Sequence, residues 1–388
     1  TFIGQHTGFN LGDSSAPPHG SATMRLNISV PEKPRTYRLE LPEIYSAYRI
    51  YVNGELLAQM GDPDPERYRP LTGNSDVMFT ASGNIELVIA ISDYSHIYSG
   101  LVYPPSFGNA EAVRQLLSAR LLIRSGVAVV ALGLGLFYLT LGLLLRKRDG
   151  IGKPALLYGF ICFCFLGYTC YPVVKTVMHS GLWWYTLENF CYIAMLALTM
   201  QVTGKLCGYR GKTTYIFPAF GALMTACTLF SSVIATGGAA LQQAWSNLIG
   251  FYFIVCALYL TAMAIYGFWC GGVQSSVMLC GVLIFDTALV MDRLLPDYEP
   301  ILTGWFAEWA GLALVLCTGV LIAQDILQKY RQHRAMAGNM ESMRRLMDTQ
   351  QAYYPLVREQ AEQARAARHD LRHHLGLVRD YAAQGDLN

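Results

Sequence analysis

The stretch LLIRSGVAVVALGLGLFYLTLGLLL, Leu121–Leu145, is followed directly by the basic run RKRDGIGK, Arg146–Lys153. A helix that crosses a membrane needs about 20 mostly apolar residues, and the first stretch meets that length. Six further apolar stretches, joined by short loops, lie between residues 154 and 323. The sequence therefore predicts a compact seven-helix transmembrane bundle, with spans at Leu121–Leu145, Pro154–Val174, Leu187–Cys207, Thr214–Ile234, Leu248–Cys270, Ser275–Leu295 and Leu302–Ala323.

Basic residues gather after alternate stretches of this series. The segments after the first, third and seventh stretches carry Arg146, Lys147, Arg148 and Lys153, then Arg210 and Lys212, then Lys329, Arg331 and Arg334. Cytoplasmic loops carry an excess of Lys and Arg, which sets the orientation of a membrane protein. We therefore expect the N-terminal block outside the cell and the C-terminus in the cytoplasm.

Composition divides the chain into three parts. It is 53% hydrophobic and 14% charged, whereas soluble domains carry about 25% charged residues. Residues 1–118 are polar, residues 119–324 are almost continuously apolar, and residues 325–388 are polar again. We predict a multi-domain membrane protein with an extracellular sensor domain, a transmembrane bundle and a cytoplasmic signalling helix. Because the chain opens on Thr1 without a signal peptide, we expect that its true start is missing.

Two kinds of site are not expected from the composition. All ten cysteines lie between Cys162 and Cys317, and their spacing does not match a metal site. They are typical of small buried apolar residues. The net charge is +2 and no dense basic stripe occurs, so we expect neither a bound metal nor a nucleic-acid partner.

The N-terminal block alternates polar and apolar residues in short runs between residues 23 and 103, as strands do. In YRIYVNGELLAQ, the pair Asn53-Gly54 separates two such runs and predicts a tight hairpin, because both turn positions favour positive φ. Several short antiparallel strands predict an extracellular all-β sandwich or jelly roll. The segment SDYSHIYSGLVYPPSFGN, Ser92–Asn109, adds exposed-looking aromatic residues.

These aromatic residues have two interpretations. Tyr98 and Tyr103 could stack on a sugar ring and form a ligand site. Alternatively, Tyr98, Tyr103 and Phe107 pack the domain against the first membrane helix. The two acidic residues inside apolar stretches, Asp286 and Glu308, are also open to interpretation. An intramembrane carboxyl is a functional candidate, or it is kept neutral, or it is hydrogen-bonded to a neighbouring helix.

The C-terminal block is rich in helix formers from Asp325 onward. Met336, Met340, Met343 and Met347 recur at spacings of four, three and four, which predicts an amphipathic face suited to a dimeric coiled coil. Pro355 is expected to kink the helix or to start a new one.

The stretch ARHDLRHHL then places His369 and His373 one turn apart on a helix face. An imidazole can act as a nucleophile toward a phosphoryl group, with Asp370 as its base and neighbouring arginines on the phosphate oxygens. A metal held by the two imidazoles, or a plain solvated face, would show the same spacing.

RHDLRHHL resembles the phosphoacceptor box of bacterial sensor histidine kinases of the GHKL type. AYRIYVNGELLAQMG and SGLVYPPSFG resemble the extracellular jelly-roll domain of seven-transmembrane receptors with diverse intracellular signalling modules. The resemblance implies a kinase of a two-component system in a bacterial cell membrane. It makes His369 the phosphorylated histidine and Asp370 its general base. His373 stands where many such kinases have Thr or Asn to position a water for dephosphorylation of the regulator.

The resemblance also implies partners and missing parts. ATP and Mg²⁺ would bind a catalytic domain beyond Asn388, so this chain would be inactive alone. The expected partners are a second copy of the chain, a cytoplasmic response regulator, membrane lipid, and an extracellular carbohydrate or other small molecule. Two alternatives stay open: a non-kinase receptor that recruits a partner through its coiled coil or carries another output, and a transporter with a sugar-binding cap.

Overall fold

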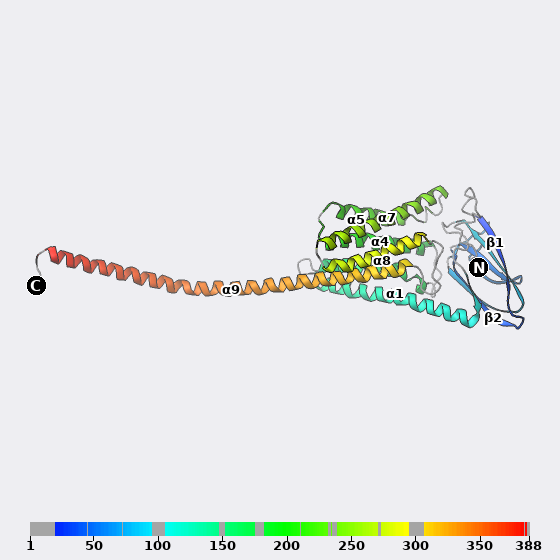
Figure 1. Cartoon of the computed structure of the whole chain (residues 1–388), viewed down its shortest axis with the longest axis horizontal. Helices are drawn as coiled ribbons and strands as arrows, with labels where there is room; N and C mark the ends of the chain where they lie inside the picture. Colours follow the sequence, from blue (N-terminus) through cyan, green and yellow to red (C-terminus); the bar gives the residue numbers. More distant parts are fainter. Residues whose placement is uncertain are drawn as a thin grey trace. The chain divides into compact units, whose positions relative to one another are not determined.

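The computed structural model describes residues 20–44, 46–71, 73–94, 105–146, 152–174, 182–209, 211–231, 234, 239–270, 273–294, 306–383 and 385. Contacts divide the chain into two units, Thr1–Asp325 and Ile326–Asn388. All the described strands belong to the first unit (Figure 1), and helix α9 runs through the boundary between the two. The division into three domains after residues 118 and 324 stays a prediction.

The described strands form two antiparallel sheets. One has the order β1-β6-β3-β4 and the other β5-β2-β7. Their bounds are β1 (Gly20–Ser29), β2 (Arg35–Ile44), β3 (Ala47–Val52), β4 (Glu55–Met60), β5 (Gly73–Ala81), β6 (Asn84–Asp93) and β7 (Ser106–Asn109). A jelly roll has eight strands in two sheets. The predicted jelly roll is therefore wrong for the described residues, which hold sheets of four and three strands.

Both sheets contribute to a single hydrophobic core. Tyr37 and Leu39 of β2 lie in it together with Ile50 of β3 and Ile89 of β6. Strand β6 alternates buried and half-buried residues along most of its length, as a period of two requires. Phe107 stacks on Tyr37 at 5.4 Å between ring centroids, so this aromatic residue packs inside the strand region.

The predicted hairpin at Asn53-Gly54 is confirmed. It joins β3 to β4, and the two turn residues have φ of 50° and 85°. Side chains other than Asn and Asp adopt positive φ at a cost, and Gly adopts it freely. The Asn53 carboxamide oxygen also accepts a hydrogen bond of 2.8 Å from the backbone N–H of Glu86, which ties the turn to β6.

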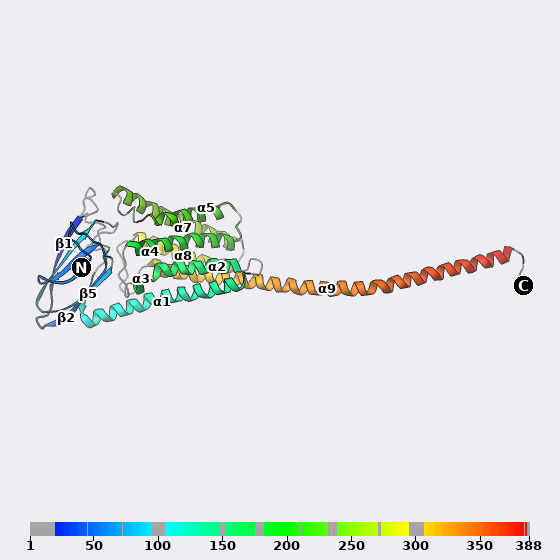
Figure 2. The ribbon, with the colours of Figure 1, turned by 180° about the vertical axis from the view of Figure 1, so that it is seen from behind.

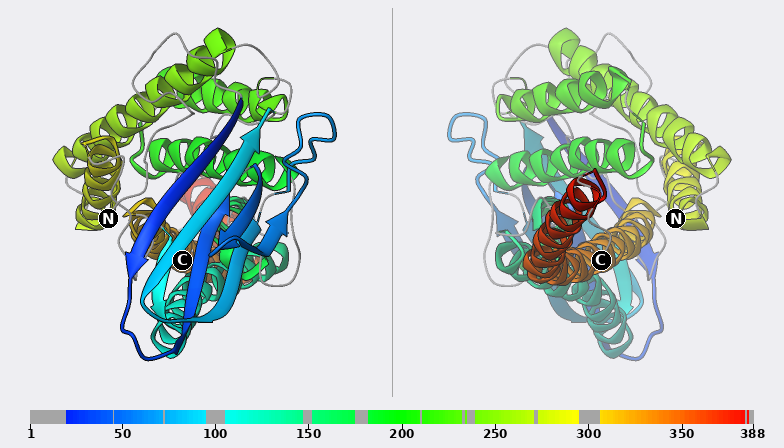
Figure 3. Two further views of the ribbon diagram at one scale, coloured as in Figure 1. Left: turned by 90° about the vertical axis from the view of Figure 1, so that its right-hand side faces the viewer. Right: turned by 90° about the vertical axis from the view of Figure 1, so that its left-hand side faces the viewer.

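Eight helices occur in the described part of the chain (Figure 2). They are α1 (Ala110–Leu144), α2 (Gly152–Thr169), α3 (Tyr171–Val174), α4 (Leu182–Leu206), α5 (Thr213–Thr228), α7 (Ala239–Trp269), α8 (Val273–Leu294) and α9 (Phe306–Ala383). Helix α1 follows β7 without a loop, and its N-cap Asn109 accepts a hydrogen bond from the backbone N–H of Glu111. Helix α2 packs between α1 and α4, α4 packs on α5, and α7 packs on α8, as the view in Figure 3 also shows.

The predicted seven spans are wrong. Among the described residues, three helices are long and apolar enough to cross a membrane: Ala110–Leu144, Ala244–Trp269 and Phe306–Ala383. The other predicted stretches form shorter or more polar helices. Helix α2 has 18 residues, α5 has 16 with Pro218 inside, and the apolar part of α8 is Ser276–Met291. Helix α4 has 25 residues but contains Glu188 and Lys205. Several predicted apolar stretches extend beyond the ends of the helices that contain them, so the sequence overestimated the number of spans.

Helix α9 is held at its start by two tyrosines. The Tyr138 hydroxyl on α1 donates a hydrogen bond of 2.8 Å to the carbonyl of Gly319, and Tyr158 on α2 donates one of 2.6 Å to the carbonyl of Val315. The two rings meet edge to face at 4.5 Å. Gly319 permits this approach, because a Cβ there would lie 2.4 Å from the Tyr158 hydroxyl oxygen.

We expect Gly319→Ala to destabilise the protein although Ala is the better helix former. Overpacking costs about 1–3 kcal/mol, and the helix-propensity gain of about 1 kcal/mol offsets only part of it. Thermal unfolding in detergent, followed with a thiol-reactive dye on the cysteines between Cys162 and Cys317, measures the change. Gly133→Ala on α1 is the matched control, since its Cβ would meet nothing within 4 Å. Adding Tyr158→Phe should restore part of the loss. Equal unfolding temperatures for the two alanine variants would contradict this packing.

Candidate phosphoacceptor site and charged junction

His369 lies on α9, the longest of the described helices. The residues around it are mostly Ala, Arg, Gln, Glu and Leu, which favour helix. The helix continues through Pro355, so a new helix does not start at this proline; the predicted kink stays a prediction. A proline removes one backbone donor from the helix, and the helix formers on both sides maintain the rest.

The imidazole of His369 and the carboxylate of Asp370 are adjacent and open to solvent. Their side chains are 82% and 76% exposed, and His369 Nδ1 lies 3.6 Å from Asp370 Oδ1. This separation is slightly longer than a hydrogen bond. A small rotation of either side chain would bring Nδ1 and Oδ1 within hydrogen-bond distance. The other ring nitrogen, Nε2, would then be free to react.

His373 follows one turn after His369, and its ring lies 6.4 Å from that of His374 at 88°. Both are exposed. Nowhere in the described ranges do three His, Cys, Asp or Glu side chains gather closely enough to hold a metal ion. Helix periodicity puts Arg365, four residues before His369, and Arg372, three residues after it, on the same face. This face of α9 therefore carries positive charge on both sides of the His369 imidazole.

The other sequence-predicted candidates have different positions. Tyr98 and Tyr103 lie outside the described residues. Asp286 on α8 accepts a hydrogen bond from the Thr261 hydroxyl of α7. Glu308 in the first turn of α9 lies 4.0 Å from Arg124 of α1. Asp286 is therefore hydrogen-bonded to a neighbouring helix, as one interpretation predicted, whereas Glu308 forms an ion pair with a neighbouring helix.

A charged junction, which sequence reasoning missed, joins β2, α1 and α9. Arg120 of α1 lies 3.7 Å from the carboxylate of Glu40 on β2, and Arg124, one turn later, contacts Glu308. The Glu40 side chain is 7% exposed and also accepts a hydrogen bond of 3.1 Å from Asn74. The i, i+4 spacing of the two arginines was visible in the sequence, but their acidic partners are distant in the chain.

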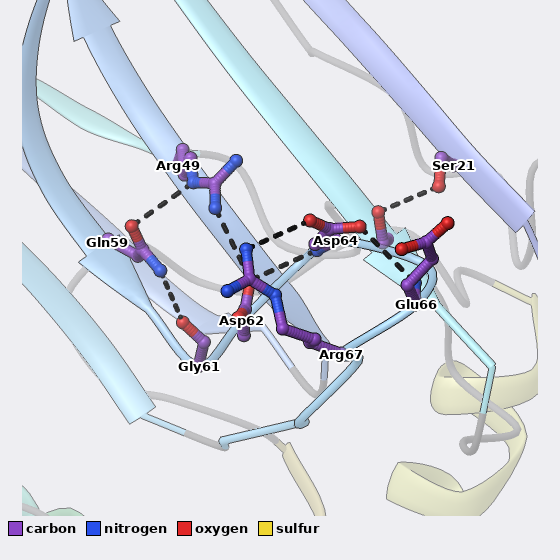
Figure 4. A network of polar contacts seen from close by, with 9 residues as sticks. Ser21, Arg49, Gln59, Gly61, Asp62, Asp64, Glu66 and Arg67 are labelled. Carbon is purple, nitrogen blue, oxygen red and sulfur yellow. Dashed lines mark hydrogen bonds and ion pairs between the residues drawn. The ribbon is translucent and has the colours of Figure 1, made fainter.

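A second polar network lies in the loop after β4 (Figure 4). Arg49 donates hydrogen bonds to Gln59 and to Asp62, and Asp62 accepts another from the backbone N–H of Asp64. The backbone N–H of Glu66, and then the Arg67 guanidinium, lower the pKa of Asp64. These bonds hold the loop against β3 and β4, so we interpret this network as structural.

Comparison with protein-family models and with curated proteins gives no match for this chain.

Proposed function

We propose that this chain is the sensing and phosphoacceptor part of a membrane histidine kinase, with His369 as the residue that is phosphorylated. The observation that supports this most is the exposed His369 beside Asp370, on a helix whose first part is apolar enough to cross a membrane. A histidine retained for packing would be buried, and a metal ligand would need further donors nearby.

The side-chain geometry supports the following step. With Nδ1 of His369 facing Asp370, the lone pair of Nε2 attacks the γ-phosphorus of ATP. A nitrogen–phosphorus bond forms, the bond from phosphorus to the bridging oxygen breaks, and its electron pair leaves with ADP. The Nδ1 proton passes to Asp370, and Arg365 and Arg372 stabilise the phosphate oxygens.

The remaining parts of the reaction come from the resemblance. ATP and Mg²⁺ would be held by a catalytic domain outside these residues, since catalysis of phosphoryl transfer is mostly positioning and charge stabilisation. A response regulator would take the phosphoryl group on an aspartate. His373 would lie beside that regulator during dephosphorylation.

A parallel homodimer is part of the proposal. Four methionines on one face of α9 are 56–74% exposed: Met336, Met340, Met343 and Met347. An apolar stripe at this spacing favours pairing with a second helix. Two copies in one membrane would present their stripes in register, because both helices leave the same leaflet.

Phosphorylation of the full-length protein in its native membranes tests the proposal, because the proposal places ATP on a catalytic domain outside these residues. Incubation with radiolabelled ATP and Mg²⁺ should give a label that is stable to base and labile to acid, as phosphohistidine is. Addition of the cognate regulator should then remove it. Wild-type protein that stays unlabelled would favour the alternative of a receptor that only recruits a partner.

The proposed orientation gives a second prediction. Any odd number of crossings places the strands and the end of α9 on opposite sides of the membrane, and the basic residues after Leu145 favour a cytoplasmic C-terminus. In a cysteine-free variant, Glu55→Cys should react with an impermeant thiol reagent in intact cells, and Gln350→Cys only after lysis. Both positions are exposed. Glu55 is preferable to Asn53, whose positive φ disfavours cysteine. Labelling at both positions in intact cells would contradict this orientation.

A further inference from the structure

A cavity of about 600 Å³ lies between the strands β2 and β5 and the start of α1. The residues that decide its chemistry are Lys33, Arg35, Arg38, Met78, Glu111 and Arg114. They come from the turn before β2, from β2 and β5 themselves, and from the first turns of α1. Four of the six are cationic, so the cavity has the chemistry of an anion site.

Two acidic groups offset only part of this charge. The Asp76 carboxylate accepts hydrogen bonds from Arg38, and these bonds raise the pKa of Arg38. Glu111 pairs with Arg114 at 2.6 Å. Within the described ranges Lys33 and Arg35 form no ion pair. The cavity therefore keeps a surplus of positive charge on side chains that are available to a ligand.

The surroundings add to this surplus. Arg38 is held by Asp76 and its side chain is 17% exposed, so its guanidinium is already ordered. The cavity also includes Ala110, the first residue of α1, where the helix dipole favours negative charge. Met78, which is 66% exposed, offers an apolar surface next to the cations.

We propose that this cavity binds a small soluble molecule that carries a carboxylate or phosphate group. The guanidinium of Arg35, which forms no ion pair in the described ranges, matches both groups through paired hydrogen bonds. Met78 and Thr36 contact the body of the molecule. Binding itself does not depend on the kinase activity proposed above.

A lipid headgroup has the same charge, but the length of α1 argues against it. The last charged residue of α1 is Arg124, so its uncharged stretch begins at Ser125. Ala110 is thus about 22 Å along the helix from the start of that stretch. The headgroup layer of a bilayer is only about 5–8 Å deep. A molecule dissolved in the aqueous phase therefore reaches the cavity more readily than a lipid does.

Calorimetric titration of the protein in nanodiscs of uncharged lipid tests this proposal. Glucuronate and inorganic phosphate are the probes, and glucose is the uncharged control. We expect both anions to bind, with an affinity that falls as salt rises, and glucose to show no binding. Lys33→Gln with Arg35→Gln should weaken binding at least about tenfold, since each lost charged hydrogen bond removes a factor of this order.

The control variant is Arg67→Gln, which removes an exposed cation from another loop of the strand region. It should bind both anions as the wild type does. Equal binding of glucose and glucuronate, unchanged binding by the double variant, or binding only in nanodiscs of anionic lipid would each overturn the proposal. His369→Gln should leave anion binding unchanged, so failure of the kinase proposal and failure of this one are distinguishable.

Discussion

His369→Gln is expected to abolish the phosphoryl label completely while leaving the protein folded. The side chain is 82% exposed on a helix, and glutamine is a good helix former, so stability should change by less than about 0.5 kcal/mol. Glutamine keeps the polarity and the approximate size of histidine but offers no nucleophilic nitrogen. Labelling of membranes with radiolabelled ATP, normalised to the amount of protein, measures the effect.

The neighbouring histidines provide the matched controls. His373→Gln and His374→Gln change the same residue type on the same exposed part of α9, and both variants should retain the label. Asp370→Asn should slow labelling without abolishing it, because general-base assistance contributes about 10²–10⁴-fold. Persistence of the label in His369→Gln together with its loss in His373→Gln would show that the wrong histidine has been assigned.

Arg124→Gln is expected to cause a large loss of stability through the charged junction. Arg124 and Glu308 are 15% and 13% exposed and lie 4.0 Å apart. Removing one partner of a buried ion pair costs about 3–5 kcal/mol, because the other charge loses the group that offset it. Because both side chains keep some exposure and lie 4.0 Å apart, we expect a cost at the lower end of this range, about 3 kcal/mol. Thermal unfolding followed through the cysteines measures the change.

Another ion pair on the same helix is the control for this prediction. Arg114 and Glu111 lie on α1, but their side chains are 60% and 57% exposed. Pairs of this kind contribute about 0–1 kcal/mol, so Arg114→Gln should have little effect on stability. In a double-mutant cycle, Glu308→Gln should cost less in the Arg124→Gln background than in the wild type. Additive losses would mean that the two side chains do not interact.

The junction has a functional implication if the kinase proposal holds. Arg120 and Arg124 are one turn apart on α1; Arg120 contacts β2 and Arg124 contacts α9. A displacement of β2 on ligand binding would therefore be transmitted through two ion pairs to the helix that contains His369. Signals of this kind act by shifting the populations of two packings.

Local chemistry explains what the sequence determined by itself. The Asn53-Gly54 hairpin depends on two residues that adopt positive φ, and the strands depend on alternation over a few neighbours, so both were predictable without the fold. Helix formers around His369 likewise placed it on an exposed helix face next to Asp370. The apolar stretches predicted helices correctly, but length and polarity within each helix reduced the candidate spans to three in the described residues.

Tertiary structure alone decided the contacts between distant segments. The Tyr138 hydroxyl and the Gly319 carbonyl that it contacts are 181 residues apart in sequence, and Arg124 is similarly distant from Glu308. The anion cavity combines the turn before β2, two strands and the start of α1. No local sequence pattern determines which acidic side chain pairs with which basic one, because the pairing depends on how the sheets and helices pack. Packing selects partners by shape and by the cost of leaving a buried charge without compensation.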